Sequence, residues 1–360
     1  MSDSRSEGLR SGLSVTIDAV AHAAGVSRQT VSNALNAPER LRPETLTSVL
    51  DTISCLGYRP NRAARSLRTR ASKLVGLRVN PAPTGSAGSL LDRFLHALVE
   101  QSVGAGYNLL AFTPMDPRDE LSGFQELLST TAVDAFVLTD THRGDRRLEW
   151  LADQEARFVA FGRPWDESLG HPWVDVDGAQ GSALAVQHLI EQGHHRIGFL
   201  GWPADSDVGE DRRVGWQRAC ERAGLPTGGL VAHSLDDIKA AGRAAAGLLD
   251  AAQPPTALVC ASDTLALGVF ALLYERGLRP GRDVAVSGFD DTPAAAVVPV
   301  GLTSVRQPLE DVATAIVDRL MSLLSAESAR GRRPTSRGAL LAPTLVVRGS
   351  TEGRIPWEDR

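Results

Sequence analysis

Apolar residues recur at helical spacing near the start of the chain. In the run TIDAVAHAAGVSRQTVSNALN (16–36), they repeat every three or four positions on both sides of Gly25. This spacing predicts two short amphipathic helices, and a glycine between them is typical of a helix end with positive φ. Thr16 and Ser27 precede the two helices and belong to the residue types that cap helices. The pattern indicates a helix-turn-helix.

The second of these helices carries its polar side chains away from the apolar face. They are Arg28, Gln29, Thr30, Ser32 and Asn33. Guanidinium, amide and hydroxyl groups match the hydrogen-bonding edges of bases in a DNA major groove. A glycine turn before a polar helix also occurs in soluble domains that bind no DNA. The pattern by itself therefore leaves both interpretations open.

A third amphipathic helix and a basic segment follow. Pro43 suits the first turn of a helix, and Leu46, Val49, Leu50, Ile53 and Leu56 form its apolar stripe before Gly57. The segment YRPNRAARSLRTRASK (58–73) has room for about three helical turns, which are marginal in water. It is either a plain linker or a helix that folds on contact with DNA and a second copy of itself.

From residue 74 onward the pattern changes to alternating strands and helices. Short apolar runs at 74–79, 107–112, 135–139, 157–162, 195–201, 257–262 and 283–290 are separated by segments with helical spacing. Such alternation predicts parallel sheets covered by helices on both faces. About 270 residues accommodate two such sheets, with a ligand cleft at the carboxyl ends of their strands. A Gly-x-Gly-x-x-Gly turn and a P-loop are both missing, so no nucleotide cofactor is expected.

The distribution of charge separates the first 75 residues from the rest. The chain has 360 residues and a formal net charge of −5. Residues 1–75 contain eleven Arg or Lys against six Asp or Glu, which is a balance of +5 and leaves −10 for the remainder. A basic head on an acidic body is typical of a DNA-reading module fused to another function.

The same sequence argues against several other classes of protein. The three cysteines are far apart and the eight histidines show no ligand spacing, so neither a disulfide framework nor a metal site is expected. No catalytic triad or paired-carboxylate motif stands out, which argues against an enzyme. The polar first residues contain no signal-peptide core, and no apolar run is long enough to cross a membrane. We therefore expect a cytoplasmic protein rather than an exported solute-binding protein.

Eight motifs spread over residues 16–351 together resemble the LacI/GalR family of bacterial repressors. TIDAVAHAAGVSRQTVSNALN resembles the family's helix-turn-helix, and GYRPNRAARSLRT resembles its hinge helix. Six later stretches match the effector-binding body in the expected order: GHHRIGFLG, DRRVGW, CASDTLALG, VAVSGFDDTP, LTSVRQP and PTLVVRGST. One such match arises easily by chance, but eight in order do not.

The resemblance implies an all-α helix-turn-helix domain with a hinge helix, followed by an α/β body of two doubly wound subdomains similar to periplasmic binding proteins. The implied boundaries are a disordered tail at 1–13, the helix-turn-helix domain at 14–60, the hinge at 61–73, the body at 74–351 and a tail at 352–360. Three crossovers divide the body into an N-subdomain (74–174 and 292–325) and a C-subdomain (175–291 and 326–351). A homodimer is expected to bind a pseudo-palindromic DNA operator.

The family pattern also implies which residues contact DNA. Arg28 and Gln29 occupy the positions that read base edges, and Leu67 aligns with a leucine that enters the minor groove. Many members have Arg where this chain has Asn33, so its role stays open. The full expected set is Thr16, Ser27, Arg28, Gln29, Thr30, Ser32, Asn33, Asn36, Tyr58, Asn61, Ala64 and Leu67.

For the effector, the resemblance implies that Arg212 and Asp263 bracket a sugar by hydrogen bonds to its hydroxyls. Arg163, Ser206, Asp207 and Asp290 are expected on loops that border the cleft, and Trp165 and Trp202 on loops where they can stack on the sugar. An Arg–Asp ion pair without a ligand role, and tryptophans that only fill gaps, are the structural alternatives.

The expected function is a dimeric repressor of carbohydrate-utilisation genes that a sugar inducer releases from its operator. The sequence leaves open two variants of this function, which are a purine or nucleoside effector and a corepressor that tightens DNA binding. Direct purine contact would favour aromatic residues at the cleft entrance, where this chain has Leu90 and Leu91. No cofactor, metal or membrane partner is expected.

Overall fold

A computed structural model describes residues 15–58, 71–79, 87–113, 119–130, 132–165, 170–325 and 338–352. Contacts divide the chain into two units, residues 1–72 and residues 73–360. The expected tails, apart from Glu352, and residues 61–70 of the expected hinge, with Asn61, Ala64 and Leu67, lie outside the described residues. Within the part of the chain that the structure describes, no helix is long and apolar enough to span a lipid bilayer.

The first unit contains the three expected helices. They are α1 (Ile17–Ala23), α2 (Arg28–Asn36) and α3 (Pro43–Leu56), with a short 3₁₀ turn, η1 (Pro38–Arg40), between the last two. The Thr16 hydroxyl accepts a hydrogen bond from Ala19 N (3.3 Å), and the Ser27 hydroxyl accepts one from Thr30 N (3.1 Å). Gly25 and Gly57 both have positive φ, 65° and 64°. Local capping chemistry therefore sets where these helices begin and end.

The core of this unit is small. Val20, Ala21, Val31, Ala34 and Val49 are buried, and Tyr58 packs against them. The apolar stripe predicted for α3 is only partly buried, because Leu50 and Leu56 remain 44% and 37% exposed. Two short helices offer too little surface to cover a stripe of four turns.

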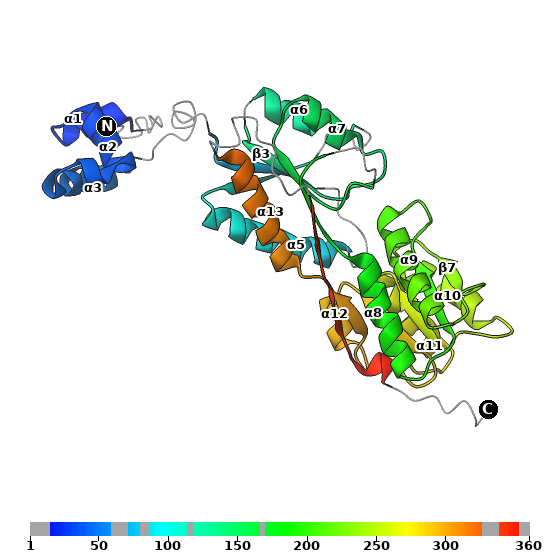
Figure 1. Cartoon of the computed structure of the whole chain (residues 1–360). Helices are drawn as coiled ribbons and strands as arrows, with labels where there is room; N and C mark the ends of the chain where they lie inside the picture. Colours follow the sequence, from blue (N-terminus) through cyan, green and yellow to red (C-terminus); the bar gives the residue numbers. More distant parts are fainter. Residues whose placement is uncertain are drawn as a thin grey trace, which may run out of the picture. The chain divides into compact units, whose positions relative to one another are not determined.

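The second unit contains two six-stranded sheets with helices on their faces (Figure 1). The first sheet has the order β11-β5-β4-β3-β1-β2. Its strands are β1 (Leu74–Arg78), β2 (Asn108–Phe112), β3 (Ala135–Leu138), β4 (Phe158–Phe161), β5 (Trp173–Val176) and β11 (Gly338–Leu341), and all of its pairings are parallel. Its helices are α5 (Ala87–Gly104), α6 (Ser122–Ser129), α7 (Arg146–Asp153) and α13 (Leu309–Leu324).

The second sheet has the order β12-β10-β9-β8-β6-β7. Its strands are β6 (Ile197–Gly201), β7 (Val231–His233), β8 (Ala257–Cys260), β9 (Ala285–Phe289), β10 (Thr303–Arg306) and β12 (Thr344–Val346), of which β12 alone pairs antiparallel. Its helices are α8 (Gly178–Glu191), α9 (Asp207–Arg222), α10 (Ile238–Leu249), α11 (Asp263–Glu275) and the short α12 (Pro293–Val297), and the 3₁₀ turn η3 (Gly349–Thr351) follows β12. The two doubly wound subdomains predicted from the sequence are confirmed.

The chain passes between the two sheets three times, but two crossings differ from the expected boundaries. Residues 292–325 were expected in the first subdomain, yet β10 pairs with β9 and β12 of the second sheet. Only α13 from that range, orange in Figure 1, lies against the first sheet beside α5. Likewise β11, expected in the second subdomain, pairs with β5 of the first. Buried Thr303 explains the first correction, since it bonds to Ser350 and Thr351 after β12.

Candidate ligand cavity and nucleic-acid interface

A cavity of about 310 Å³ lies at the carboxyl ends of strands from both sheets. Strands β1, β4, β5 and β9 each end in a residue that lines it. Strand ends of parallel sheets are the usual place for a ligand, because the chain is free to vary there. The lining residues are Arg78, Leu90, Leu91, Phe94, Thr139, Asp140, Thr141, Phe161, Gly162, Arg163, Trp165, Asp175, Val176, Gly178, Val208, Asp211, Arg212, Phe289 and Gln307.

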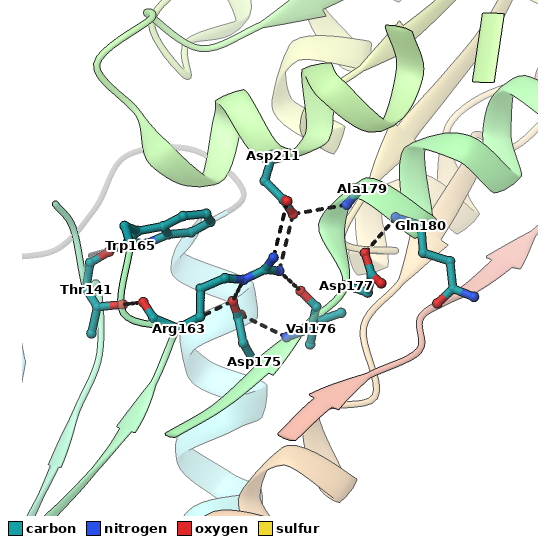
Figure 2. Close-up of polar contacts among 9 residues, drawn as sticks. All are labelled: Thr141, Arg163, Trp165, Asp175, Val176, Asp177, Ala179, Gln180 and Asp211. Atoms are coloured by element: carbon teal, nitrogen blue, oxygen red, sulfur yellow. Dashed lines mark hydrogen bonds and ion pairs between the residues drawn. The ribbon is translucent and has the colours of Figure 1, made fainter. Parts of the chain in front are cut away.

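Arg163 is the centre of a charged network on one wall of this cavity (Figure 2). Its Nε donates to Asp175 Oδ2 on β5 (2.7 Å), and its Nη1 donates to Asp211 Oδ1 on α9 (3.2 Å). A further hydrogen bond runs from Nη2 to Val176 O (3.1 Å). Because β5 belongs to the first sheet and α9 packs on the second, the guanidinium of Arg163 connects the two subdomains.

The protonation of this network follows from burial and charge. Burial alone lowers the pKa of Arg163, but the carboxylates of Asp175 and Asp211 outweigh it and raise the pKa above its ordinary value. Burial has the largest effect on the pKa of Asp211 and raises it. The positive charge of Arg163 acts in the opposite direction. Arg163 is therefore charged at any physiological pH, and it offsets part of the cost of burying Asp211.

Arg212 lines the same cavity and is buried, with 5% of its surface exposed. Its guanidinium lies 3.6 Å from the Phe289 ring centroid, forms an ion pair with Asp290 (3.6 Å) and donates to Ala261 O. Asp290 also accepts a hydrogen bond from Gln307 Nε2 (2.7 Å) and has a φ of 106°. A buried cation with a carboxylate behind it is preorganised to donate to ligand oxygens.

Asp263 is held in a buried hydrogen-bond network next to the second sheet. Its side chain is buried and is not part of the cavity lining. Its Oδ2 accepts from the amide and hydroxyl of Thr292 (2.7 and 2.8 Å), and its Oδ1 accepts from Ser304 Oγ (2.5 Å). Burial, followed by the charge of Asp290, raises the pKa of Asp263 to about 7. Asp263 thus connects α11 to β10 and to the start of α12, and its expected contact with a ligand stays a prediction.

The other expected effector residues divide into two groups. Arg163 and Trp165 line the cavity, and the indole of Trp165 is held by a hydrogen bond to Thr141 O (3.2 Å). Four residues do not belong to the lining, namely Trp202, Ser206, Asp207 and Asp290. Ser206 caps α9, Asp207 accepts from Arg143 N (2.7 Å), and Trp202 bonds to Asp236 (3.1 Å) with its ring 5.0 Å from Arg212.

Several lining residues were not predicted from the sequence. Asp211 precedes Arg212 in the DRRVGW motif, so the motif itself was a signal for it. Asp175 and Arg78 stand at or near the ends of strands, where side chains reach a cleft. In the sequence, Phe94, Phe161 and Phe289 have the pattern of core residues. Phe94 and Phe161 do pack together, with ring centroids 4.7 Å apart. No local pattern distinguishes such rings from the rest of the core.

The expected DNA-contacting residues of the first unit are partly exposed. Arg28, Gln29 and Asn36 are exposed, whereas Thr30, Ser32 and Asn33 are half-buried. The amide Nε2 of Gln29 donates to Asn33 Oδ1 (2.9 Å). Thr16 and Ser27 act as helix caps, and Tyr58 packs on the small core. Polar groups of α2 are thus available to a nucleic acid at its N-terminal end.

Comparisons with known proteins match both units. The model of "Bacterial regulatory proteins, lacI family" matches residues 16–61, and that of "Periplasmic binding protein-like domain" matches residues 186–351. The regulator AglR of Rhizobium meliloti is 32% identical over 94% of both chains. The regulator CelR of Thermobifida fusca is 34% identical over 85% of this chain and 92% of its own.

A solved structure extends this likeness to the fold. The structure titled "transcriptional regulator CelR-cellobiose complex" superposes with a TM-score of 0.69 and 28% identity, covering 93% of this chain and 99% of that one. The capped helix-turn-helix, the two parallel-rich sheets and the identity over almost the whole length agree. The chain therefore belongs to the lacI family of bacterial regulatory proteins.

Proposed function

We propose that this protein is a ligand-responsive repressor. As a homodimer it binds a pseudo-palindromic operator through α2, and it is released when a sugar occupies the cavity of the second unit. The observation that carries the proposal is the pairing, in one chain, of a helix-turn-helix whose second helix exposes polar side chains with a cavity lined by three Arg and three Asp side chains.

The DNA-binding half of the proposal rests on α2. Ser27 caps this helix, so the first side chains beyond the cap, Arg28 and Gln29, project where they can reach base edges. Arg suits guanine and Gln suits adenine in the major groove. The hinge residues Asn61, Ala64 and Leu67 are proposed to contact the centre of the operator, with Leu67 entering the minor groove.

The ligand-binding half rests on the cavity and on one relative. Charged donors and acceptors from both sheets face a space that is otherwise lined by aromatic and aliphatic side chains, an arrangement that suits the hydroxyls and apolar faces of a sugar. The CelR relative carries cellobiose in its title. Arg212 and Arg163 are the residues we propose to donate to the sugar.

A purine or nucleoside effector is the alternative. Leu90 and Leu91 do line the cavity, as expected, and they offer no ring for stacking. Phe94, Phe161, Trp165 and Phe289 also line it, so the leucines alone do not decide against a purine. A ligand screen has to include both classes.

The test of DNA binding is selection from random duplexes with the purified full chain. We expect one two-fold symmetric sequence to be enriched. Arg28→Ala and Gln29→Ala should each relax selection at particular base pairs, at a cost of about 1–3 kcal/mol in operator binding. Arg40→Ala, an equal loss of charge on an exposed residue outside α2, is the matched control. If no sequence is enriched over non-specific DNA, the DNA-binding half of the proposal fails.

The effector half is tested by thermal shift against sugars and purines. A ligand present at 100 times its Kd stabilises the folded chain by about 2.7 kcal/mol. Each hit is then added to the operator complex, where release identifies an inducer and tighter binding identifies a corepressor. A purine as the sole hit would replace the sugar in the proposal.

A further inference from the structure

Arg78, the last residue of β1, is a half-buried cation in the cavity wall, and no side chain among the described residues forms a hydrogen bond or ion pair with it. Its Nε is buried and has no hydrogen-bond partner. Arg163 and Arg212, the other two arginines among the described lining residues, both form ion pairs. A buried donor without an acceptor costs free energy, so its persistence at a cavity wall points to a group supplied by a ligand.

The surroundings of Arg78 explain why no carboxylate neutralises it. One of the carboxylates that act on Arg78, Asp145, is occupied by Arg147, which donates to it from Nε (2.9 Å) and Nη2 (2.7 Å). Arg147 also donates to the backbone oxygens of Thr139 and Asp140, and so shapes the lining segment after β3. Burial, followed by the like charge of Arg147, lowers the pKa of Arg78. Both effects are relieved when a ligand oxygen accepts from its guanidinium.

The two arginines reach the cavity from different sheets, because Arg78 ends β1 of the first sheet and Arg212 packs on Phe289 at the end of β9 of the second. The charges that act on Arg78 are those of Arg147, Glu120, Asp140 and Asp145, all from the first subdomain. The charges that act on Arg212 are those of Asp290, Asp211, Asp175 and Asp236. The two sets have no member in common, although both arginines line one cavity. Apolar side chains of α5 and β4, including Leu90, Leu91, Phe94 and Phe161, supply the rest of the wall.

Charge and volume restrict the ligand further. Three Arg and three Asp are among the described lining residues, so the formal charges balance and a strongly anionic ligand gains nothing. At about 30 Å³ per water in the liquid, the cavity of about 310 Å³ holds the volume of about ten waters. A single hexose has about twelve heavy atoms, and because they are covalently bonded they take up less volume than the same number of waters. A hexose therefore does not fill the cavity.

We infer that Arg78 is a specificity-determining residue and that the cavity takes an uncharged disaccharide, with one sugar unit at Arg212 and the other at Arg78. The inference rests on the proposed function, because it assigns the ligand class of that same site. The Arg78 guanidinium donates to hydroxyl or ring oxygens of the second unit, and the apolar wall lies against the faces of both rings.

The test is isothermal titration calorimetry of the full chain and of Arg78→Met, which keeps the length of the side chain and removes the donors. The probes are cellobiose, maltose, trehalose and sucrose, together with glucose, galactose and glucose 6-phosphate. At least one disaccharide should bind more tightly than either monosaccharide and than the phosphate. Arg78→Met should weaken that disaccharide by about 10- to 100-fold and leave monosaccharide binding unchanged.

Arg276→Met removes an exposed arginine that pairs with Asp250 far from the lining, and serves as the matched control. Arg78→Lys keeps the positive charge but loses the planar guanidinium with its fixed donors. It replaces the Met variant if that variant does not fold. It should lose part of the disaccharide affinity.

The inference is overturned if a monosaccharide or glucose 6-phosphate binds best, if no probe binds, or if Arg78→Met weakens both sugar classes equally. Monosaccharide binding with release from operator DNA would still support the proposed function. Loss of sequence-specific DNA binding in the selection would defeat the proposed function independently of these titrations.

Discussion

At the scale of single residues, burial separates two aspartates that look equivalent in the sequence. Asp290 pairs with Arg212 and Gln307 at the edge of the cavity. Asp263 is enclosed by Thr292 and Ser304, with no cation bonded to it among the described contacts. A carboxylate that accepts only from hydroxyl and amide groups in a dry site is expensive to ionise.

The raised pKa of Asp263, to about 7, predicts a pH-dependent stability. An unfolded Asp loses its proton near pH 4. Between about pH 4 and 7 the folded chain therefore holds a proton that the unfolded chain has released. This contribution to stability is complete below pH 4 and is lost as the pH rises through 7. It amounts to about 4 kcal/mol.

Asp263→Asn removes this titration and tests the prediction. Urea unfolding at pH 5 and pH 8 should show the wild type losing stability relative to the variant at the higher pH. Asp153→Asn, at an exposed site on α7, is the control and should follow the wild type. A difference between wild type and Asp263→Asn that stays constant with pH would contradict the assignment.

Among the helices, two glycines within helical segments have opposite effects on stability. Gly215 on α9 faces the backbone of Ala179 on α8, and a Cβ there would collide with the Ala179 carbonyl. Gly247 on α10 is exposed and has open space where a Cβ would lie. The first glycine lets α8 and α9 approach closely, whereas the second only weakens its helix.

Alanine at the two positions should therefore change stability in opposite directions. Gly215→Ala should lower the free energy of unfolding by about 1–3 kcal/mol through overpacking. Gly247→Ala should raise it by about 0.5–1 kcal/mol through helix propensity. Urea unfolding of both variants in parallel provides the comparison. Equal effects of the two substitutions would show that α8 and α9 tolerate a wider separation.

At the scale of the whole molecule, the cavity belongs to neither sheet alone. Arg163 connects Asp175 with Asp211, and Arg143, before α7, donates to Asp207 on α9. A ligand between the subdomains adds contacts to both, so it favours one relative orientation of the sheets over others. In the proposed function, this orientation of the two sheets is what ligand binding changes.

Coupling of this kind has to be reciprocal. If a sugar lowers operator affinity by a factor of about 5–150, operator DNA must lower sugar affinity by the same factor. Calorimetric titration of the sugar into the free chain and into its operator complex gives the second factor, and DNA binding with and without sugar gives the first. Two unequal factors would mean that the ligand acts outside this equilibrium, for instance on the assembly of the dimer.

The sequence alone determined the elements whose signals are local. Caps at Thr16 and Ser27, the positive-φ turn at Gly25 and the strand–helix alternation after residue 74 all depend on neighbours a few positions away. The family motifs added the two-subdomain body. Short strands such as β5, β10 and β11 were not predicted, because three or four residues carry too little periodicity to be recognised.

Only the tertiary structure decided which strands pair and which charges face the cavity. Next to the pairing of β10 with β12, the backbone amide of Thr303 donates to the Ser350 hydroxyl (2.8 Å), 47 positions away in the sequence. Whether an aspartate is buried or lines a cavity depends on what packs around it, so Asp263 is buried in a hydrogen-bond network while Asp211 lines the cavity. Burial and hydrogen bonding across long sequence separations set these roles, and no local pattern encodes them.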